Sequence, residues 1–202
     1  MMITTIIFDL DGVLDDSYEM HYEYSRKKFT NLTREEHRKL FEGNIHAERA
    51  KLAHRDTGFD FAGHVNSSRF GKEMPVMTKN VVETLAQRYR LGIISSGMES
   101  GIHAYLKHND VSQCFAFVYG VETSKSKEEK LKILLTQFHL EKTECIFVTD
   151  TLGDIKEANI LGIKAIGYTG GYHERERLTK GNPYAIIDNL NQIEEILKSL
   201  NT

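Results

Sequence analysis

The feature that most constrains the fold of this chain is the alternation of short apolar runs with longer segments of helical periodicity. The apolar runs are residues 3–8, 91–94, 115–119, 145–148, 164–168 and 185–187. Between them, apolar residues recur at the spacing of one helix face, as in residues 81–89 and 131–138. This alternation is typical of a parallel sheet covered by helices. We therefore predict an α/β fold whose core is a Rossmann-like, doubly wound parallel sheet.

One long segment, residues 16–77, interrupts the alternation. It is rich in charges and contains helical patterns at residues 18–29 and 34–41, the second of which begins with a capping-box pair, Thr33 and Glu36. Connections in compact domains are usually only a few residues long. We therefore interpret residues 16–77 as a small all-helical cap inserted after the first strand, and residues 1–15 and 78–202 as the core domain. A cap at that position is well placed to act as a lid.

Composition argues against several classes of partner. The 29 acidic residues outnumber the 26 Lys and Arg, the net charge is −3, and no long run has one sign, so the chain lacks the basic face of nucleic-acid binders.

No apolar stretch approaches the roughly 18 residues that span a bilayer, and no basic segment precedes the first apolar run, as a signal peptide requires. The two cysteines, Cys114 and Cys145, are too few for a disulfide framework and are expected to be reduced. We expect a cytoplasmic protein with no nucleic-acid or membrane partner; the oligomeric state is left open.

Polar and mostly acidic residues follow the predicted strands. Ligands of open α/β sheets bind outside the carboxyl ends of the strands, so these residues should meet at one edge. They are Asp9, Asp11 and Gly12 after the first strand, Ser95, Ser96 and Gly97 after the second, Lys125 near the start of a later helix, and Asp150 and Asp154 after residues 145–148. Each group alone is more often a turn or a helix cap. Independent turn residues, however, have no reason to gather at the same edge.

Phosphate chemistry explains this combination of residue types. Four carboxylates in one place would repel one another unless a cation neutralised them, and Mg²⁺ takes one or two carboxylates together with waters and a phosphate oxygen. Ser95 and Lys125 could hold the remaining phosphoryl oxygens. Gly12, with Ser96 and Gly97, would bring the backbone close to the substrate. The sequence therefore predicts a Mg²⁺ site that binds a small phosphorylated metabolite.

These residues resemble the haloacid dehalogenase superfamily, and specifically its phosphoglycolate-phosphatase-like branch, which carries a helical cap. The similarity rests on residues 8–14 (FDLDGVL), followed by Asp16 and Ser17, on residues 91–96, and on residues 146–155 (IFVTDTLGDI). It extends from the first predicted strand to the last helix. The resemblance implies a magnesium-dependent phosphatase that forms an aspartyl-phosphate.

The resemblance also implies a role for each matched residue. Asp9 would be the nucleophile, and Asp11 the general acid and base. The carboxylates of Asp9 and Asp150 and the backbone carbonyl of Asp11 would bind Mg²⁺, with Asp154 supporting the metal. Ser95 and a lysine of the third motif would orient the phosphoryl group.

The chain departs from the family pattern at three places. The third motif is commonly Lys-Pro, whereas residues 124–127 read SKSK; spacing back from Asp150 favours Lys125, and Lys127 is the alternative. Thr149 stands where the family usually has glycine. Asp15 stands where it usually has an apolar residue, and the sequence offers no reason for it.

Three other functions are compatible with parts of the pattern. A phosphosugar mutase would share the core chemistry and differ in how the cap excludes water. A dehalogenase needs neither Asp11 nor a metal, and a non-catalytic binding module would have no use for the nucleophile. Candidates in the cap for meeting an anionic leaving group are Lys27, Lys28, His46, Arg49 and Lys51, although a solvated helix face explains these residues more simply.

Overall fold

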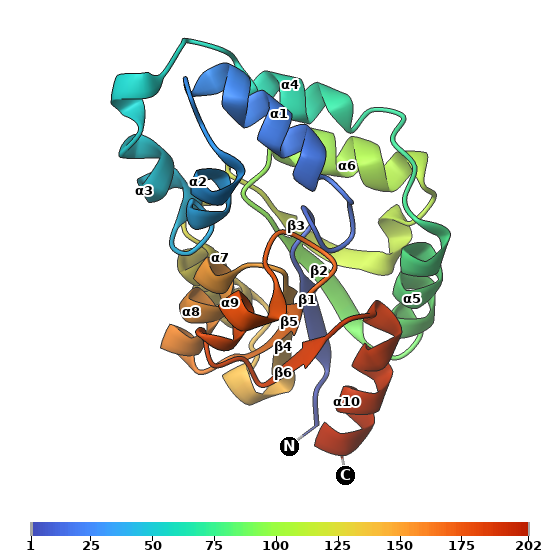
Figure 1. Ribbon diagram of the computed structural model, residues 1–202. Coiled ribbons are helices and arrows are strands. Elements are labelled where there is room, and N and C mark those ends of the chain that lie inside the picture. Colours follow the sequence, from blue (N-terminus) through green and yellow to red (C-terminus); the bar gives the residue numbers. More distant parts are fainter. Residues whose placement is uncertain (1, 202) are drawn as a thin grey trace.

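The computed structural model describes residues 2–201, and its centre is a six-stranded parallel sheet (Figure 1). The strands are β1 (Thr5–Phe8), β2 (Arg90–Ile94), β3 (Phe115–Tyr119), β4 (Cys145–Thr149), β5 (Lys164–Tyr168) and β6 (Ala185–Ile187). Their order, β3-β2-β1-β4-β5-β6, is that of a doubly wound Rossmann-like sheet. The predicted fold class is confirmed, and every predicted apolar run forms a strand.

The register of the central strands places the ends of β1 and β4 side by side. Phe8 is aligned with Val148 of β4 and with Ile93 of β2. The Asp9 N–H donates to the Val148 carbonyl at 2.9 Å, so the pairing continues past the end of β1. The residues that follow these strands therefore meet at the switch point of the sheet, where ligands of such folds bind.

Helices cover both faces of the sheet. They are α5 (Val76–Ala86), α6 (Glu99–His108), α7 (Lys127–Gln137), α8 (Leu152–Leu161), α9 (Arg175–Thr179) and α10 (Ile193–Leu200). Ile6 of β1 belongs to one buried cluster with Val82 of α5, and Ile7 to the other with Leu131 of α7. Figure 1 shows α5 and α10 on one side of the sheet and α7, α8 and α9 on the other. The strands are thus apolar on both faces, as a covered parallel sheet requires.

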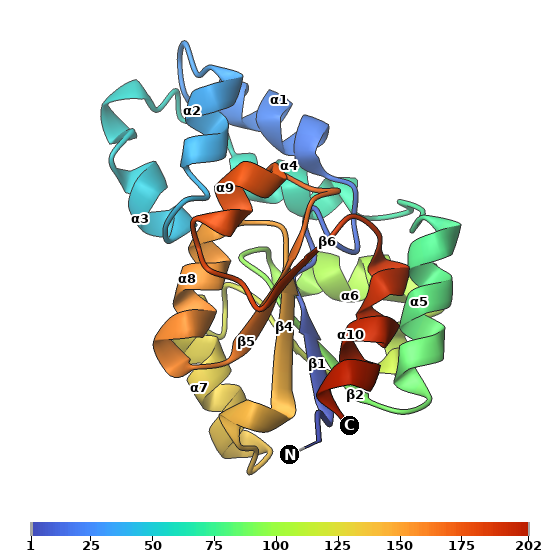
Figure 2. The ribbon, with the colours of Figure 1, turned by 60° about the horizontal axis from the view of Figure 1, so that its bottom comes forward.

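The segment between β1 and α5 is helical and lies over the carboxyl edge of the sheet (Figures 1 and 2). Its helices are α1 (Tyr18–Lys28), α2 (Arg34–Lys39), α3 (Ile45–Ala50) and α4 (Phe61–Ser68). The capping box of Thr33 and Glu36 forms at the start of α2, as predicted. Short 3₁₀ turns complete the chain at Ala53–Arg55, Ser112–Cys114, Lys142–Glu144 and Leu190–Gln192. The division into a cap and a core remains our interpretation of this arrangement.

Backbone hydrogen bonds hold the helical segment against the sheet domain. The Gly153 N–H of α8 donates to the Phe41 carbonyl at 2.8 Å, and a Cβ on Gly153 would lie 2.4 Å from the carbonyl oxygen of Gly43. His173 Nε2 lies 2.9 Å from the Arg38 carbonyl oxygen. These contacts fix the helical segment over the sheet edge. Within residues 2–201, no helix has the length and apolar character needed to cross a membrane.

Candidate active site

Asp9, Lys127 and Asp154 form a buried charged cluster at the end of β1. Lys127 Nζ lies 2.6 Å from Asp9 Oδ2 and 2.6 Å from Asp154 Oδ2. Thr149, which stands where the family usually has glycine, donates from Oγ1 to Asp154 Oδ2 at 2.6 Å. Burial raises the pKa of Asp9 to about 7, and the Lys127 ammonium opposes this rise. A second cation beside Asp9 would therefore favour its charged form.

The lysine beside Asp9 is Lys127 and not Lys125, which corrects the position expected from the spacing. Lys125 is exposed, and its backbone carbonyl accepts a hydrogen bond from Asn44 Nδ2 at 3.0 Å. The cause is the helix start: Ser126 caps α7 by accepting the Glu129 N–H. Lys127 is thus the first helical residue, and side chains there point back toward the helix N-terminus, which here is the sheet edge.

Asp11 is enclosed by side chains from the helical segment. Arg69, at the end of α4, places Nη2 2.6 Å from both carboxylate oxygens. Ser17 Oγ donates to Asp11 Oδ1 at 3.0 Å, and His21 Nε2 lies 3.4 Å from the same oxygen. Burial alone would raise the pKa of Asp11, but the charge of Arg69 and the hydrogen bonds from Arg69 and Ser17 hold it well below the usual range. Asp11 is therefore a carboxylate next to Asp9.

Asp150 has a buried oxygen with no partner. Its Oδ1 makes no hydrogen bond, while Oδ2 accepts the Tyr172 N–H at 2.7 Å. A Cβ on Gly12 would lie 2.0 Å from Oδ2, and one on Gly171 would lie 2.2 Å away, so glycine is needed at both positions. Gly12 also has a φ of +81°, which favours glycine. Burial, and then the charge of Asp9, raise the pKa of Asp150 well above its ordinary value. A bound cation would satisfy this oxygen.

Asp9 and Asp150 fit the donor set that Mg²⁺ prefers. In the part of the chain that the structure describes, no three His, Cys, Asp or Glu side chains gather closely enough to enclose a metal by themselves. Mg²⁺ does not require this, because it commonly takes only one or two carboxylates and completes its shell with waters and phosphate oxygens. Asp154 already accepts hydrogen bonds from Lys127 and Thr149. With these two hydrogen bonds in place, Asp154 is better positioned to orient Lys127 than to contact the metal directly.

The turn after β2 presents backbone, rather than Ser95 itself, to the site. Ser95 is fully buried; its Oγ accepts the Gly97 N–H at 3.0 Å, and its carbonyl accepts a hydrogen bond from Lys130 Nζ at 2.5 Å. Ser96 and Gly97 line the cavity described below, whereas Gly12 packs against Asp150 instead. Burial lowers the pKa of Lys130 to about 8.

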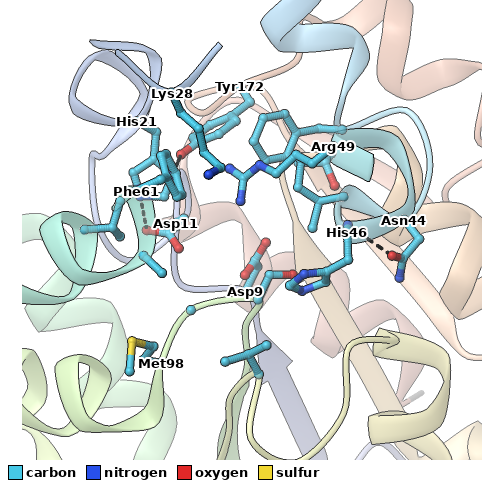
Figure 3. Close-up of a pocket in the computed structure, with 18 of the residues that line it drawn as sticks. Asp9, Asp11, His21, Lys28, Asn44, His46, Arg49, Phe61, Met98 and Tyr172 are labelled. Carbon is cyan, nitrogen blue, oxygen red and sulfur yellow. Dashed lines mark hydrogen bonds and ion pairs between the residues drawn. The ribbon is translucent and has the colours of Figure 1, made fainter. Parts of the chain in front are cut away.

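The helical segment and the sheet domain enclose a cavity of about 480 Å³ (Figure 3). Asp9 and Asp11 lie on its core side, and Lys28, His46 and Arg49 lie on its cap side. Two further cap candidates are not among the lining residues. Lys27 lies over the ring of Tyr24, and Lys51 is exposed and paired with Glu48.

Several residues of the site were not predicted from the sequence, and the loop of residues 170–173 gave only a weak resemblance to a family loop. Arg69 lies in no recognisable motif, and only the fold brings it to Asp11. Tyr172 joins the two parts of the molecule, because its hydroxyl lies 2.7 Å from His21 Nδ1 and 3.2 Å from Ser17 Oγ. Asp15, for which the sequence offered no reason, is fully buried and forms an ion pair with Lys72.

Comparison with known proteins identifies relatives of the same architecture. The family model described as haloacid dehalogenase-like hydrolase matches residues 6–168. A phosphoglycolate phosphatase from Photorhabdus laumondii is 30% identical over 122 residues, which cover 59% of this chain and 52% of that protein. The chain thus matches about half the length of this relative. Pyrophosphatase PpaX from Bacillus mycoides is 23% identical over 214 residues, which cover 100% of both chains.

Solved structures share the fold at low sequence identity. A haloacid dehalogenase-like family hydrolase from Streptococcus pneumoniae has a TM-score of 0.76 at 20% identity and covers 96% of this chain and 98% of its own. CbbY from Rhodobacter sphaeroides, solved in complex with phosphate, has a TM-score of 0.75 at 16% identity and covers 95% and 96%. Both alignments include the helical segment as well as the sheet domain.

Proposed function

The chain belongs to the haloacid dehalogenase-like hydrolase family, and from this premise we propose that it is a magnesium-dependent phosphatase acting on a small phosphate monoester. The observation that carries the proposal is the buried cluster at the end of β1. There Asp9 faces the cavity beside Lys127, and the unpartnered Oδ1 of Asp150 lies on the same sheet edge. A nucleophilic carboxylate, a fixed cation and a carboxylate oxygen able to bind a metal ion are the parts that phosphoryl transfer needs.

The proposed reaction has two displacements. The Asp9 carboxylate attacks phosphorus, and the bond between phosphorus and the leaving oxygen breaks with its electron pair remaining on that oxygen. Asp11 first takes up a proton, against the Arg69 charge that favours its ionised form, and passes it to the leaving group; as a carboxylate it then accepts a proton from the attacking water. Water displaces the Asp9 carboxylate from phosphorus, which releases inorganic phosphate and regenerates Asp9.

Fixed positive charge stabilises both displacements. The Lys127 ammonium lies beside Asp9 and would oppose the charge that builds up on the phosphoryl oxygens. Asp9 and Asp150 would hold Mg²⁺, which would add further charge stabilisation at the phosphoryl oxygens. The Ser96-Gly97 backbone, at the cavity wall, would receive a remaining oxygen. Asp154 and Thr149 would keep Lys127 in place.

The relatives support phosphoryl transfer to water but do not define the substrate. Those compared above are named for phosphoglycolate and for pyrophosphate, which differ in the group that leaves. Substrate identity therefore has to be argued from the cavity of this chain.

Phosphate release from 4-nitrophenyl phosphate, measured with and without MgCl₂, tests the proposal. We expect turnover that needs Mg²⁺ and that is lost in Asp9→Asn, whereas Asp110→Asn, at an exposed aspartate that does not line the cavity, serves as the matched control. Full turnover in excess chelator, or in Asp9→Asn, would contradict the mechanism.

A further inference from the structure

One face of α3 points two unpartnered polar side chains into the cavity. His46 and Arg49 are three residues apart and therefore lie on the same helix face, and Figure 3 shows both directed toward the space above Asp9. His46 Nε2 and Arg49 Nε are buried and have no hydrogen-bond partner. Among residues 2–201, no carboxylate lies within ion-pair distance of Arg49; its guanidinium lies 4.1 Å from the centre of the Phe61 ring.

The other cations near this site have acceptors within the protein. Arg69 contacts Asp11, Lys127 contacts Asp9 and Asp154, and Lys28 contacts Asp56. Leaving a buried cation without an acceptor costs free energy. Burial lowers the pKa of Arg49 to about 10, so it remains charged at neutral pH. Arg49 is thus a charged donor facing the cavity for which the protein supplies no acceptor.

Apolar side chains from both parts of the molecule line much of the cavity, namely Phe41, Ile45, Phe61, Val65, Met98 and Val121. Polar residues of the helical segment, such as Lys28, Asn44 and Asp60, line it as well. The volume of about 480 Å³ falls within the range of about 300–1,000 Å³ that is usual for drug-sized ligands. A phosphoryl group and a metal ion would fill only the part beside Asp9. The remaining space has the size and apolar surface suited to a ring, and α3 contributes the polar side chains that lack a hydrogen-bond partner there.

We propose that the leaving group contains a ring that lies in the apolar space. Arg49 and His46 recognise hydrogen-bond acceptors on the edge of this ring farthest from Asp9. The substrate is thus a ring-bearing phosphate monoester about the size of a nucleoside monophosphate. A two-carbon phosphate ester or pyrophosphate is too small to fill this space. This inference rests on the proposed function and adds to it the identity of the leaving group. Arg49 matches such a ring because its fork of donors pairs with two neighbouring acceptors, as arginine does with guanine.

Steady-state kinetics on a defined panel test the inference. The ring-bearing esters are guanosine 5′-monophosphate, uridine 5′-monophosphate and pyridoxal 5′-phosphate; the small substrates are phosphoglycolate, pyrophosphate and acetyl phosphate. We expect kcat/KM for the best ring-bearing ester to exceed that for phosphoglycolate and for pyrophosphate by at least about tenfold, since one lost charged hydrogen bond alone is worth that much. Equal or faster turnover of either small substrate would overturn the proposal.

Two variants test whether α3 and the apolar space recognise the leaving group. Arg49→Met should raise KM for the preferred ring-bearing ester by about 10- to 100-fold and change acetyl phosphate turnover less than about threefold, because acetyl phosphate does not extend to α3. Lys51→Met, which removes an exposed cation beside the same helix, is the matched control. Val65→Phe narrows the apolar space from α4 and should reduce activity on the ring-bearing ester alone, which keeps the test available if Arg49→Met fails to fold.

The outcomes separate this inference from the function on which it rests. Loss of phosphate release from every compound, acetyl phosphate included, would refute the phosphatase itself. Turnover of acetyl phosphate with no preference for a ring would refute only the substrate class. Equal effects of Arg49→Met on all substrates would show that Arg49 has a structural role and would also overturn the inference.

Discussion

The two aspartates at the end of β1 lie two residues apart, yet they have different surroundings. Asp9 faces Lys127, whereas Asp11 is held by Arg69 and His21. Asp9→Asn should abolish phosphoenzyme formation, because an amide cannot attack as a carboxylate. Asp11→Asn should lose about 10²- to 10⁴-fold in turnover, with a smaller loss for a nitrophenyl ester, whose leaving oxygen needs little protonation. Mass spectrometry of acid-quenched enzyme should show a phosphoryl adduct on the Asp9 peptide of the Asp11 variant; an adduct elsewhere would contradict the assignment.

Lys125 and Lys127 allow a second test at the level of single residues. Lys127 is buried between Asp9 and Asp154, whereas Lys125 is exposed. Lys127→Met should reduce kcat by about 10²- to 10³-fold, the usual effect of removing one group that stabilises developing charge. Lys125→Met is the matched control and should stay close to wild type. The reverse result would show that Lys125, as the family spacing suggests, reaches the phosphoryl group when substrate binds.

At the scale of elements, α2 is held by a histidine buried among aromatic rings. His37 is fully buried, packs against Tyr18, Tyr22 and Phe41, and has no hydrogen-bond partner on either ring nitrogen. Burial lowers its pKa to about 2. An unfolded histidine has a pKa near 6.5, so the unfolded chain binds the extra proton below that pH. The contribution of His37 to stability is therefore complete above pH 6.5 and declines as the pH falls toward 2.

This titration predicts a specific change in the pH dependence of stability. Between pH 7.5 and pH 5, His37 should account for about 2 kcal/mol of the fall in unfolding free energy. His37→Phe should remove that part, so the variant should lose less stability than wild type over the same range. His54→Phe, at an exposed position, is the control. Urea denaturation at the two pH values measures the difference, and parallel pH dependence in wild type and His37→Phe would contradict the prediction.

At the scale of the whole molecule, the sheet edge concentrates negative charge beneath the helical segment. Mg²⁺ bound only by the folded state should raise the unfolding free energy by about 2.7 kcal/mol at a concentration 100 times its Kd. Asp150→Asn should remove most of this effect, since it replaces the charged carboxylate, one oxygen of which has no protein partner, with a neutral amide. Calorimetric melting at increasing MgCl₂ measures the shift, with Asp110→Asn as the control. An equal shift in Asp150→Asn and wild type would place the metal elsewhere.

The elements of this protein could be predicted because their signals are local. A run such as residues 115–119 is a strand because neighbouring residues are apolar, and α2 begins at Arg34 because Thr33 and Glu36 cap it. The position of the acidic residues could be predicted as well, because they follow strands whose carboxyl ends meet at one edge of the sheet. The sequence by itself therefore determined the sheet, its helices and the edge that carries the chemistry.

Tertiary structure decided which side chains face one another at that edge. Lys127, rather than Lys125, lies beside Asp9 because α7 starts at the Ser126 cap, which directs the side chain of its first residue toward the sheet edge. Arg69 reaches Asp11 across 58 positions of sequence, and Arg49 faces the cavity without an acceptor, only because the helical segment folds over the sheet. These contacts depend on how the helical segment packs against the sheet domain. Local sequence patterns do not encode that packing.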